Sequence, residues 1–168
     1  MIDMGEAKLD LWKEIFGDEN IRHCFTCGRC VAGCPASEAR NPLRIRSIVR
    51  MVLLGLEDEL LDEDSPWACV TCTRCEEMCP MGVRPFEVGL AVRKWQCAND
   101  ETRIPPAIVD LYTRGYSMPV GANPDLREEL GLERELPLIT SDPELHEKWK
   151  KVLMSVKLIK DNDYMFGE

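Results

Sequence analysis

The sequence predicts a mainly α-helical protein organised around two copies of one cysteine motif. Apolar residues recur at helical spacing in several stretches that begin at prolines or at residues that cap helices. The stretches CFTCGRCVAGCP, residues 24–35, and CVTCTRCEEMCP, residues 69–80, share one pattern of cysteines. A predicted helix follows each of them. We divide the chain of 168 residues into a cysteine-containing domain, residues 1–100, and an extension, residues 101–168.

The first predicted helix precedes the first motif. Residues 6–16 place Leu9, Trp12 and Phe16 at helical spacing with charges between them. This spacing is typical of an amphipathic helix that covers one side of a core. The acidic stretch at residues 57–64, which leads into the second motif, is predicted to be a solvated helical end or a loop.

A helix with signals at both of its ends is predicted after the first motif. Asn41 is a suitable N-cap, Pro42 a suitable first residue and Gly55 a suitable stop. Its apolar stripe consists of Ile45, Ile48, Val49, Val52 and Leu56. A second such helix follows the second motif at residues 85–97, with Phe86, Leu90 and Trp95 among its apolar positions. The repetition predicts an internal duplication with approximate two-fold symmetry.

The C-terminal extension has few helical signals. Residues 100–141 contain five prolines and three glycines, so we expect a mostly extended or looped segment with one short helix between Pro124 and Gly131. A last helix is predicted to begin at Asp142 and Pro143 and to continue to Val156. Such an extension either packs on the core or docks a partner.

Charge and hydropathy exclude several classes of partner. The formal net charge of −9 opposes binding to nucleic acid, because phosphate contacts need a basic surface. The N-terminus lacks the basic region, apolar stretch and cleavage site of a secretory signal, so we expect a cytoplasmic protein. The longest apolar run, at residues 51–56, is far shorter than the roughly 20 residues of a spanning helix. We therefore expect no direct membrane insertion.

Both cysteine stretches have the pattern Cys-x2-Cys-x2-Cys-x3-Cys-Pro. This is the bacterial ferredoxin run that holds [4Fe-4S] clusters, and in proteins with two clusters its fourth cysteine binds the other cluster. The pattern predicts two [4Fe-4S] clusters whose ligands cross between the motifs. Cluster 1 would bind Cys24, Cys27, Cys30 and Cys79, and cluster 2 would bind Cys69, Cys72, Cys75 and Cys34. Pro35 and Pro80 would turn the chain away after each fourth ligand.

Cysteines at close spacing have two other uses. They also build zinc sites, in which case the chain would be an interaction module without a redox role. A zinc site does not require three evenly spaced cysteines and a fourth cysteine before a proline, nor does it require this pattern to occur twice. Disulfides are disfavoured because no secretory signal precedes the motifs. Cys97 belongs to neither motif and is predicted to be a buried or idle thiol.

Several residues near the ligands have two interpretations. Thr26, Thr71, Arg29 and Arg74 repeat at equivalent positions and would either raise the reduction potential or face solvent. Phe25, Trp67, Val70 and Met78 would exclude water from the clusters or serve as ordinary packing. Arg44, Arg46 and Arg50 would form a docking patch or a solvated face. His23 and His146 are predicted to be surface or capping residues.

No catalytic residue can be assigned. The chain has no glycine-rich dinucleotide fingerprint, no phosphate loop, no Ser/His/Asp arrangement and no zinc-protease motif. Two clusters that are fully ligated by cysteine leave no open iron for a substrate, so their expected work is to pass single electrons. Because a relay needs a donor and an acceptor, we expect the chain to be a subunit of a larger redox complex.

Both motifs, together with ARNPLRIRSIVRMVLLG and GVRPFEVG, resemble the C subunit of heterodisulfide reductase over residues 5–100. The resemblance implies the α-helical ferredoxin fold and a non-catalytic role as an electron-transfer subunit in methanogenesis. The implied partners are a flavin-containing donor subunit and a catalytic subunit that reduces the coenzyme M–coenzyme B disulfide. Two related roles stay open, in a membrane-bound quinone-linked dehydrogenase or in a sulfur-metabolising complex.

Overall fold

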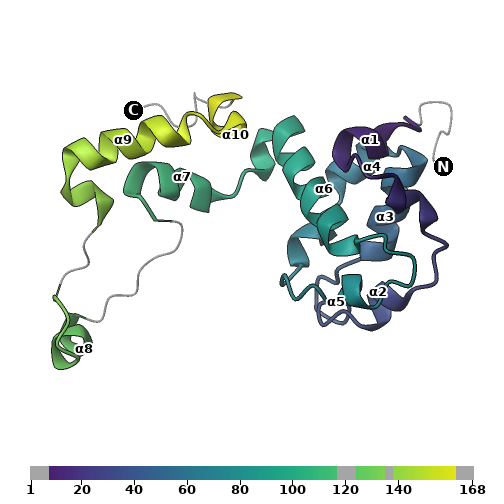
Figure 1. The fold of residues 1–168 in the computed structure, drawn as a ribbon, viewed down its shortest axis with the longest axis horizontal. Coiled ribbons are helices and arrows are strands. Elements are labelled where there is room, and N and C mark those ends of the chain that lie inside the picture. The colour runs from purple at the N-terminus through teal and green to yellow at the C-terminus, as the bar shows by residue number, and fades with distance from the viewer. Residues whose placement is uncertain (1–7, 117–123, 135–137, 162–168) are drawn as a thin grey trace. The chain divides into compact units, whose positions relative to one another are not determined.

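The computed structural model of the chain describes residues 8–116, 124–134 and 138–161 (Figure 1). Every regular element in these ranges is a helix, so the predicted mainly α-helical class is confirmed. The chain divides into two compact units, residues 1–100 (unit 1) and residues 101–168 (unit 2), and each is described by itself. No helix within the described ranges is both long and apolar enough to cross a bilayer.

Unit 1 is built around two packed helices, α3 and α6. Its elements are α1 (Leu11–Ile15), η2 (Glu19–His23), α2 (Arg29–Ala32), α3 (Ile45–Leu54), α4 (Glu57–Asp62), η3 (Ser65–Ala68), α5 (Arg74–Glu77) and α6 (Pro85–Asn99). Helices α1 and α4 pack on α3 and α6. The short helices α2 and α5, which lie inside the two motifs, contact each other at one end of the unit (Figure 1). Unit 1 thus has a helical core at one end and both motifs at the other.

Helix α3 has the predicted apolar stripe and the predicted end. All five residues of the stripe are buried. Gly55 ends the helix in the left-handed region, with φ +69°. The predicted start was wrong, because the helix begins at Ile45 after Arg44 instead of at Pro42. The N–H of Leu43 donates to the carbonyl of Ala36 (3.0 Å), and the Leu43 side chain is buried. These contacts tie residues 41–43 to the end of the first motif and keep them out of the helix.

The stretch of chain before α1 runs over the end of α3. The N–H of Lys8 donates to the carbonyl of Gly55 (3.0 Å), and a Cβ added to Gly55 would meet the Lys8 backbone at 2.2 Å. Glycine is therefore required here for space as well as for its φ angle. Helix α1 starts only at Leu11, so the buried pair is Leu11 and Trp12. Leu9 is exposed, in contrast to the prediction.

Helix α6 is confirmed, but its buried face differs from the predicted one. Val88, Val92 and Trp95 are buried, whereas Leu90 is exposed. Gln96, one turn from Val92, is fully buried among them. Its Nε2 donates to the carbonyls of Leu60 (2.8 Å) and Glu63 (2.7 Å), and its Oε1 accepts from Nε1 of Trp67 (2.9 Å). These bonds satisfy the buried amide and attach the chain before the second motif to α6.

Arg93, on the same helix, holds the residue at which the second motif begins. Its Nε donates to the carbonyl of Pro66 (2.7 Å) and its Nη2 to the carbonyl of Cys69 (3.0 Å). The guanidinium also lies 5.4 Å from the centre of the Trp67 ring, within the range of a cation–π contact. Arg93 and Gln96 together fix the path of the chain from α4 to Cys69.

Unit 2 contains α7 (Pro106–Arg114), α8 (Pro124–Glu129), α9 (Pro143–Leu153) and α10 (Lys157–Asp161), with the short elements η4 (Glu101–Arg103) and η5 (Ile139–Ser141). Helix α8 and the start of α9 match the prediction, and the Asp142 carboxylate caps α9 by accepting from the N–H groups of Glu144 and Leu145. Helix α9 ends at Leu153, earlier than predicted, and a turn leads into α10.

Helix α7 contradicts the prediction of a mostly looped segment at residues 100–141. Its first residue is Pro106, where a missing N–H costs nothing, and Gly115 ends it with φ +78°. Apolar residues of α7 pack with α9 and α10 around the buried side chains of Leu153 and Ile159. Nε1 of Trp149 donates to the carbonyl of Leu111 (3.1 Å). Residues 117–123 and 135–137 of the predicted looped segment lie outside the described residues.

Candidate iron-sulfur site

The two cysteine motifs follow the same backbone path. The residue before the second cysteine has positive φ in both motifs, +65° at Thr26 and +57° at Thr71. The residue after the second cysteine is also left-handed, with φ +82° at Gly28 and +58° at Thr73. A four-residue helix then starts, α2 in the first motif and α5 in the second. The two motifs therefore resemble each other in backbone conformation as well as in sequence, as the predicted duplication implies.

Left-handed threonines are strained, because a β-branched residue with positive φ crowds its own backbone. Such outliers cost roughly 1–3 kcal/mol each, persist only where the surrounding structure holds them, and gather at functional sites. In each motif the two reversals lie on either side of the second cysteine. They curl a segment of seven residues so that three of its cysteines can surround one volume.

One pocket brings together cysteines of both motifs. Cys24, Cys27, Cys30 and Cys79 line a pocket of about 400 Å³ that is partly open to solvent. These are the four residues predicted to bind cluster 1. The rest of the lining comes from residues beside these cysteines and from α3 and the start of α6, and includes Phe25, Arg29, Arg46, Val49, Met81 and Val83.

The cysteines of the second predicted set lie in the loop before α5, on α5 itself and after α2. Burial raises the pKa of the Cys75 thiol to about 12, and the neighbouring Cys69 and Cys30 contribute to that rise. Burial also raises the pKa of Cys30, with Cys24 and Cys27 adding to the effect. Cys34 follows α2, which contacts α5. The convergence of Cys34 with Cys69, Cys72 and Cys75 on one cluster stays a prediction.

Helices α2 and α5 contact each other near two residues with side chains of very different size. Gly33 and Met78 each precede the fourth cysteine of their motif and are thus equivalent positions. A Cβ added to Gly33 would lie 2.0 Å from Sδ of Met78. The methionine side chain therefore fills the space that a side chain at residue 33 would need, so Met78 is a packing residue between the motifs.

The donor set fits iron-sulfur clusters. Each predicted set offers four thiols, and backbone N–H groups point at two of the sulfur atoms. The N–H of Thr71 donates to Sγ of Cys69 (3.4 Å) and that of Val83 to Sγ of Cys79 (3.4 Å). Such bonds stabilise thiolate charge. In the described ranges, no three metal-binding side chains converge on a point suited to a single ion. A cluster instead binds one thiolate at each of four separate irons.

The structure separates some of the alternatives left open for flanking residues. Trp67 is half-buried and bonded to Gln96, which favours packing. Phe25 and Val70, at equivalent positions, are 62% and 61% exposed. His23 is exposed as predicted, whereas Nε2 of His146 is buried without a hydrogen-bond partner among the described residues. Cys97 is buried on α6, as predicted.

Arg93 and Gln96 were not predicted from the sequence. Neither is a ligand candidate, but both hold the backbone that enters the second motif. The sequence shows only that an arginine and a glutamine lie on the helix that follows this motif. Their role depends on hydrogen bonds to carbonyls 24 to 36 residues earlier in the chain. No local pattern indicates such a partner.

We expect the replacement Thr73→Gly to stabilise the protein by about 1 kcal/mol, because it removes the left-handed strain of a β-branched residue. The converse replacement, Gly28→Thr, should destabilise it by a similar amount. The nearest atom to a Cβ at Gly28 is Nη1 of Arg46 at 3.5 Å, an ordinary contact, so strain is the main change. Unfolding in urea without oxygen measures the change in the free energy of unfolding for both variants. A change in the same direction in both variants would contradict the interpretation.

Comparison with known proteins defines the class of this protein. Residues 20–83, which include all eight motif cysteines, match the family described as a 4Fe-4S dicluster domain. The part of unit 1 that carries the cysteine pocket is thus similar to the domains of 4Fe-4S iron-sulfur proteins.

The relatives define the family within that class. The chain is 35% identical over 153 residues to a protein of Archaeoglobus profundus named as like the C subunit of heterodisulfide reductase, covering 89% of this chain and 79% of the relative. It is 31% identical over 141 residues to the C subunit of the H(2):CoB-CoM heterodisulfide,ferredoxin reductase of Methanothermobacter thermautotrophicus, covering 82% and 75%. It is 30% identical over 172 residues to the iron-sulfur C subunit of the CoB–CoM heterodisulfide reductase of Methanopyrus kandleri, covering 96% and 84%. The chain belongs to the family of heterodisulfide reductase C subunits.

Proposed function

We propose that this chain is the electron-relay subunit of a heterodisulfide reductase-type complex in the cytoplasm. It would receive single electrons from a flavin-containing subunit and deliver them to a catalytic subunit that reduces the coenzyme M–coenzyme B disulfide. The observation that carries the proposal is the pocket lined by Cys24, Cys27, Cys30 and Cys79, since it combines cysteines of both motifs. The names of the relatives supply the type of complex.

The residues that would hold the cofactors are the eight motif cysteines. We assign Cys24, Cys27, Cys30 and Cys79 to cluster 1 and Cys69, Cys72, Cys75 and Cys34 to cluster 2. When bound, the two [4Fe-4S] clusters supply one-electron acceptor and donor chemistry. Because every iron would have a cysteine ligand, the assignment leaves no position for a substrate.

The protein itself would provide fixed ligand positions and a partly dry surrounding. The left-handed residues on both sides of Cys27 and Cys72 set the turn of each motif. The N–H groups of Thr71 and Val83 stabilise negative charge on the sulfur atoms that they face. Val49 and Val83, both buried, line the first pocket and would give it a partly apolar wall.

Purification or reconstitution without oxygen tests the proposal. We expect a brown protein with about eight iron and eight sulfide per chain, a visible absorbance that bleaches on reduction, and a paramagnetic signal in the reduced state. The native complex, isolated through a tag on this chain, should contain a flavin and reduce the mixed disulfide of coenzymes M and B. A colourless protein that holds zinc would contradict the proposal, as would a complex with a haem-bearing membrane subunit and no disulfide reduction.

A further inference from the structure

Positive charge gathers on the half of unit 1 that carries the first motif. Residues 20–50 contain six arginines and a single acidic residue, Glu38, in a chain whose net charge is −9. Residues 57–77, which lead through the second motif, contain eight acidic residues and a single arginine, Arg74. Six of these acidic residues belong to α4 and the turn after it, whereas the second motif itself carries Glu76 and Glu77 and the first motif carries no acidic residue. The two motifs thus differ in charge, although their backbones follow the same path.

Two of the six arginines lie at the first cysteine pocket. Arg29 and Arg46 both line it, and the lining includes no aspartate or glutamate. Neither guanidinium forms an ion pair with any described residue. Arg84, which follows Val83 of the lining, differs in this respect, because it pairs with Asp18 (2.5 Å) and Glu87 (2.6 Å). The charge of Arg29 and Arg46 is therefore available to another molecule.

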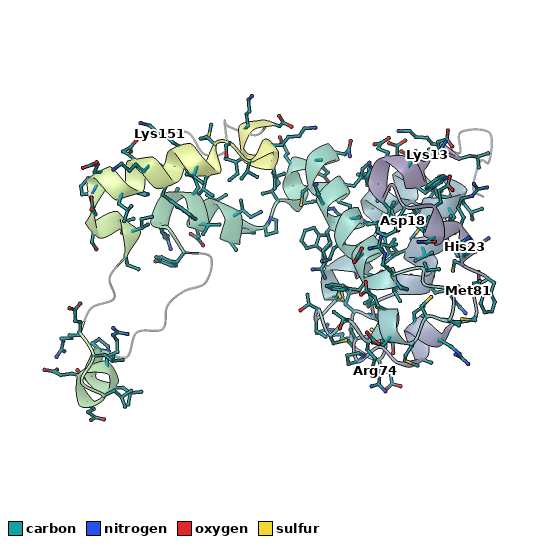
Figure 2. All side chains as sticks on the ribbon, in the orientation of Figure 1. Lys13, Asp18, His23, Arg74, Met81 and Lys151 are labelled. Carbon is teal, nitrogen blue, oxygen red and sulfur yellow. The ribbon has the colours of Figure 1, made fainter. Side chains whose placement is uncertain are left out.

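Two exposed apolar side chains border the same pocket. Phe25 is 62% exposed and Met81 is 43% exposed, and both line the pocket beside the cysteines. In Figure 2, Met81 lies at the outer edge of unit 1, on the side that also carries His23. Aromatic residues, methionine and arginine are the types enriched in protein–protein interfaces. A phenylalanine and a methionine that line the same pocket as two unpaired arginines have the composition of a small docking surface.

We propose that the surface formed by Phe25, Arg29, Arg46 and Met81, called here the first-motif face, docks a redox protein subunit whose contact surface is acidic. This inference rests on the proposed function, because a relay must pass electrons to or from a partner beside one of its cysteine sets. Carboxylates of the partner would pair with the two arginines and steer the encounter. The apolar centre would exclude water from the contact nearest to the cysteines.

The second motif provides an internal control for this assignment. Val70 occupies the position equivalent to Phe25 and is 61% exposed, and Arg74 occupies the position equivalent to Arg29. Glu76 and Glu77 follow Cys75 directly and place two carboxylates beside it. An acidic partner would be repelled there, so the two motifs would dock different subunits.

Photo-crosslinking in the native complex tests the proposal. A benzophenone amino acid replaces Phe25 in one tagged chain and Val70 in another, and each complex is isolated and irradiated without oxygen. We expect the probe at residue 25 to crosslink to an acidic segment of a redox subunit and the probe at residue 70 to crosslink elsewhere. The double change Arg29→Glu and Arg46→Glu should lower the yield at residue 25 roughly tenfold or more. The matched change Arg40→Glu and Arg50→Glu, outside the pocket lining, should lower it less than about threefold.

Iron and sulfide are measured in every complex before irradiation, which separates the two proposals. A chain without iron-sulfur clusters contradicts the proposed function. With clusters intact, three results overturn the docking proposal alone: no crosslink at residue 25, a crosslink to a second copy of this chain, or equal loss of yield in the two charge-reversal variants. A crosslink from residue 25 to a basic segment of a partner also overturns it.

Discussion

Replacing Cys79 by alanine is expected to remove the iron-sulfur cluster of the first motif, although Cys79 belongs to the second. The reason is the pocket, in which Cys79 lies with Cys24, Cys27 and Cys30. Iron should fall from about eight to about four per chain. The change Cys34→Ala should cause the same loss by removing the other cluster. Cys97→Ala, which removes a buried thiol outside both motifs, should leave the iron content at about eight.

Double variants distinguish the crossed assignment from an uncrossed one. If Cys24 and Cys79 serve the same cluster, the double change Cys24→Ala and Cys79→Ala leaves about four iron, as each single change does. The double change Cys24→Ala and Cys34→Ala then removes nearly all iron. Ligands that stay within one motif would give the opposite pattern, and that result would reject our assignment. Circular dichroism shows whether each variant retains its helices.

Gly33→Ala is expected to destabilise the protein by about 1 kcal/mol, the low end of the range for overpacking, because the atoms in the way belong to the flexible, half-buried Met78 side chain. The added Cβ would lie 2.0 Å from Sδ of Met78, so the methionine side chain must leave its place between α2 and α5. In the background of Met78→Ala the same change should cost much less, and the two substitutions should couple by about 0.5–1 kcal/mol. Unfolding by urea of the four proteins of this cycle, without oxygen, measures the coupling.

Gly89→Ala is the matched control for this cycle. Gly89 lies inside α6, and the nearest atom to an added Cβ is Cδ1 of Ile45 at 3.4 Å, an ordinary contact. Alanine is the better helix former by about 1 kcal/mol, so this change should be neutral or stabilising. Additive effects of Gly33→Ala and Met78→Ala would show that the two residues do not compete for space, and would contradict the packing described here.

The helices that could be predicted are those whose caps and apolar periodicity agree. In α3, the stripe from Ile45 to Val52 and the stop at Gly55 both proved right. The start was misplaced because the bond from Leu43 to Ala36 is tertiary and has no local signal. Helix α7 was not predicted, because the prediction of a looped segment rested on the number of prolines and not on their positions. Pro106 stands at the first turn, where proline favours a helix.

The cysteines that share the first pocket could be predicted from the sequence, whereas the backbone conformation of the motifs could not. The cysteine spacing is local, and it indicated both the chemistry and the set that shares the first pocket. The left-handed conformation of Thr26, Thr71 and Thr73 runs against the preference of a β-branched residue, so no propensity indicates it. Gly28, opposite Thr73 in the alignment of the motifs, was the available hint. The buried amide of Gln96 becomes meaningful only when the carbonyls around it are known.

The contact between Gly33 and Met78 shows what is gained by carrying both motifs on one polypeptide. In a dimer of identical chains, a residue near the two-fold axis faces its own copy, so a large side chain there must make room for another of the same size. When the two halves are fused in one chain, equivalent positions can hold residues of different size. A large side chain such as Met78 can then fill the space left by a small residue such as Gly33. The halves are then no longer exchangeable, and each is free to acquire its own charge and its own neighbours.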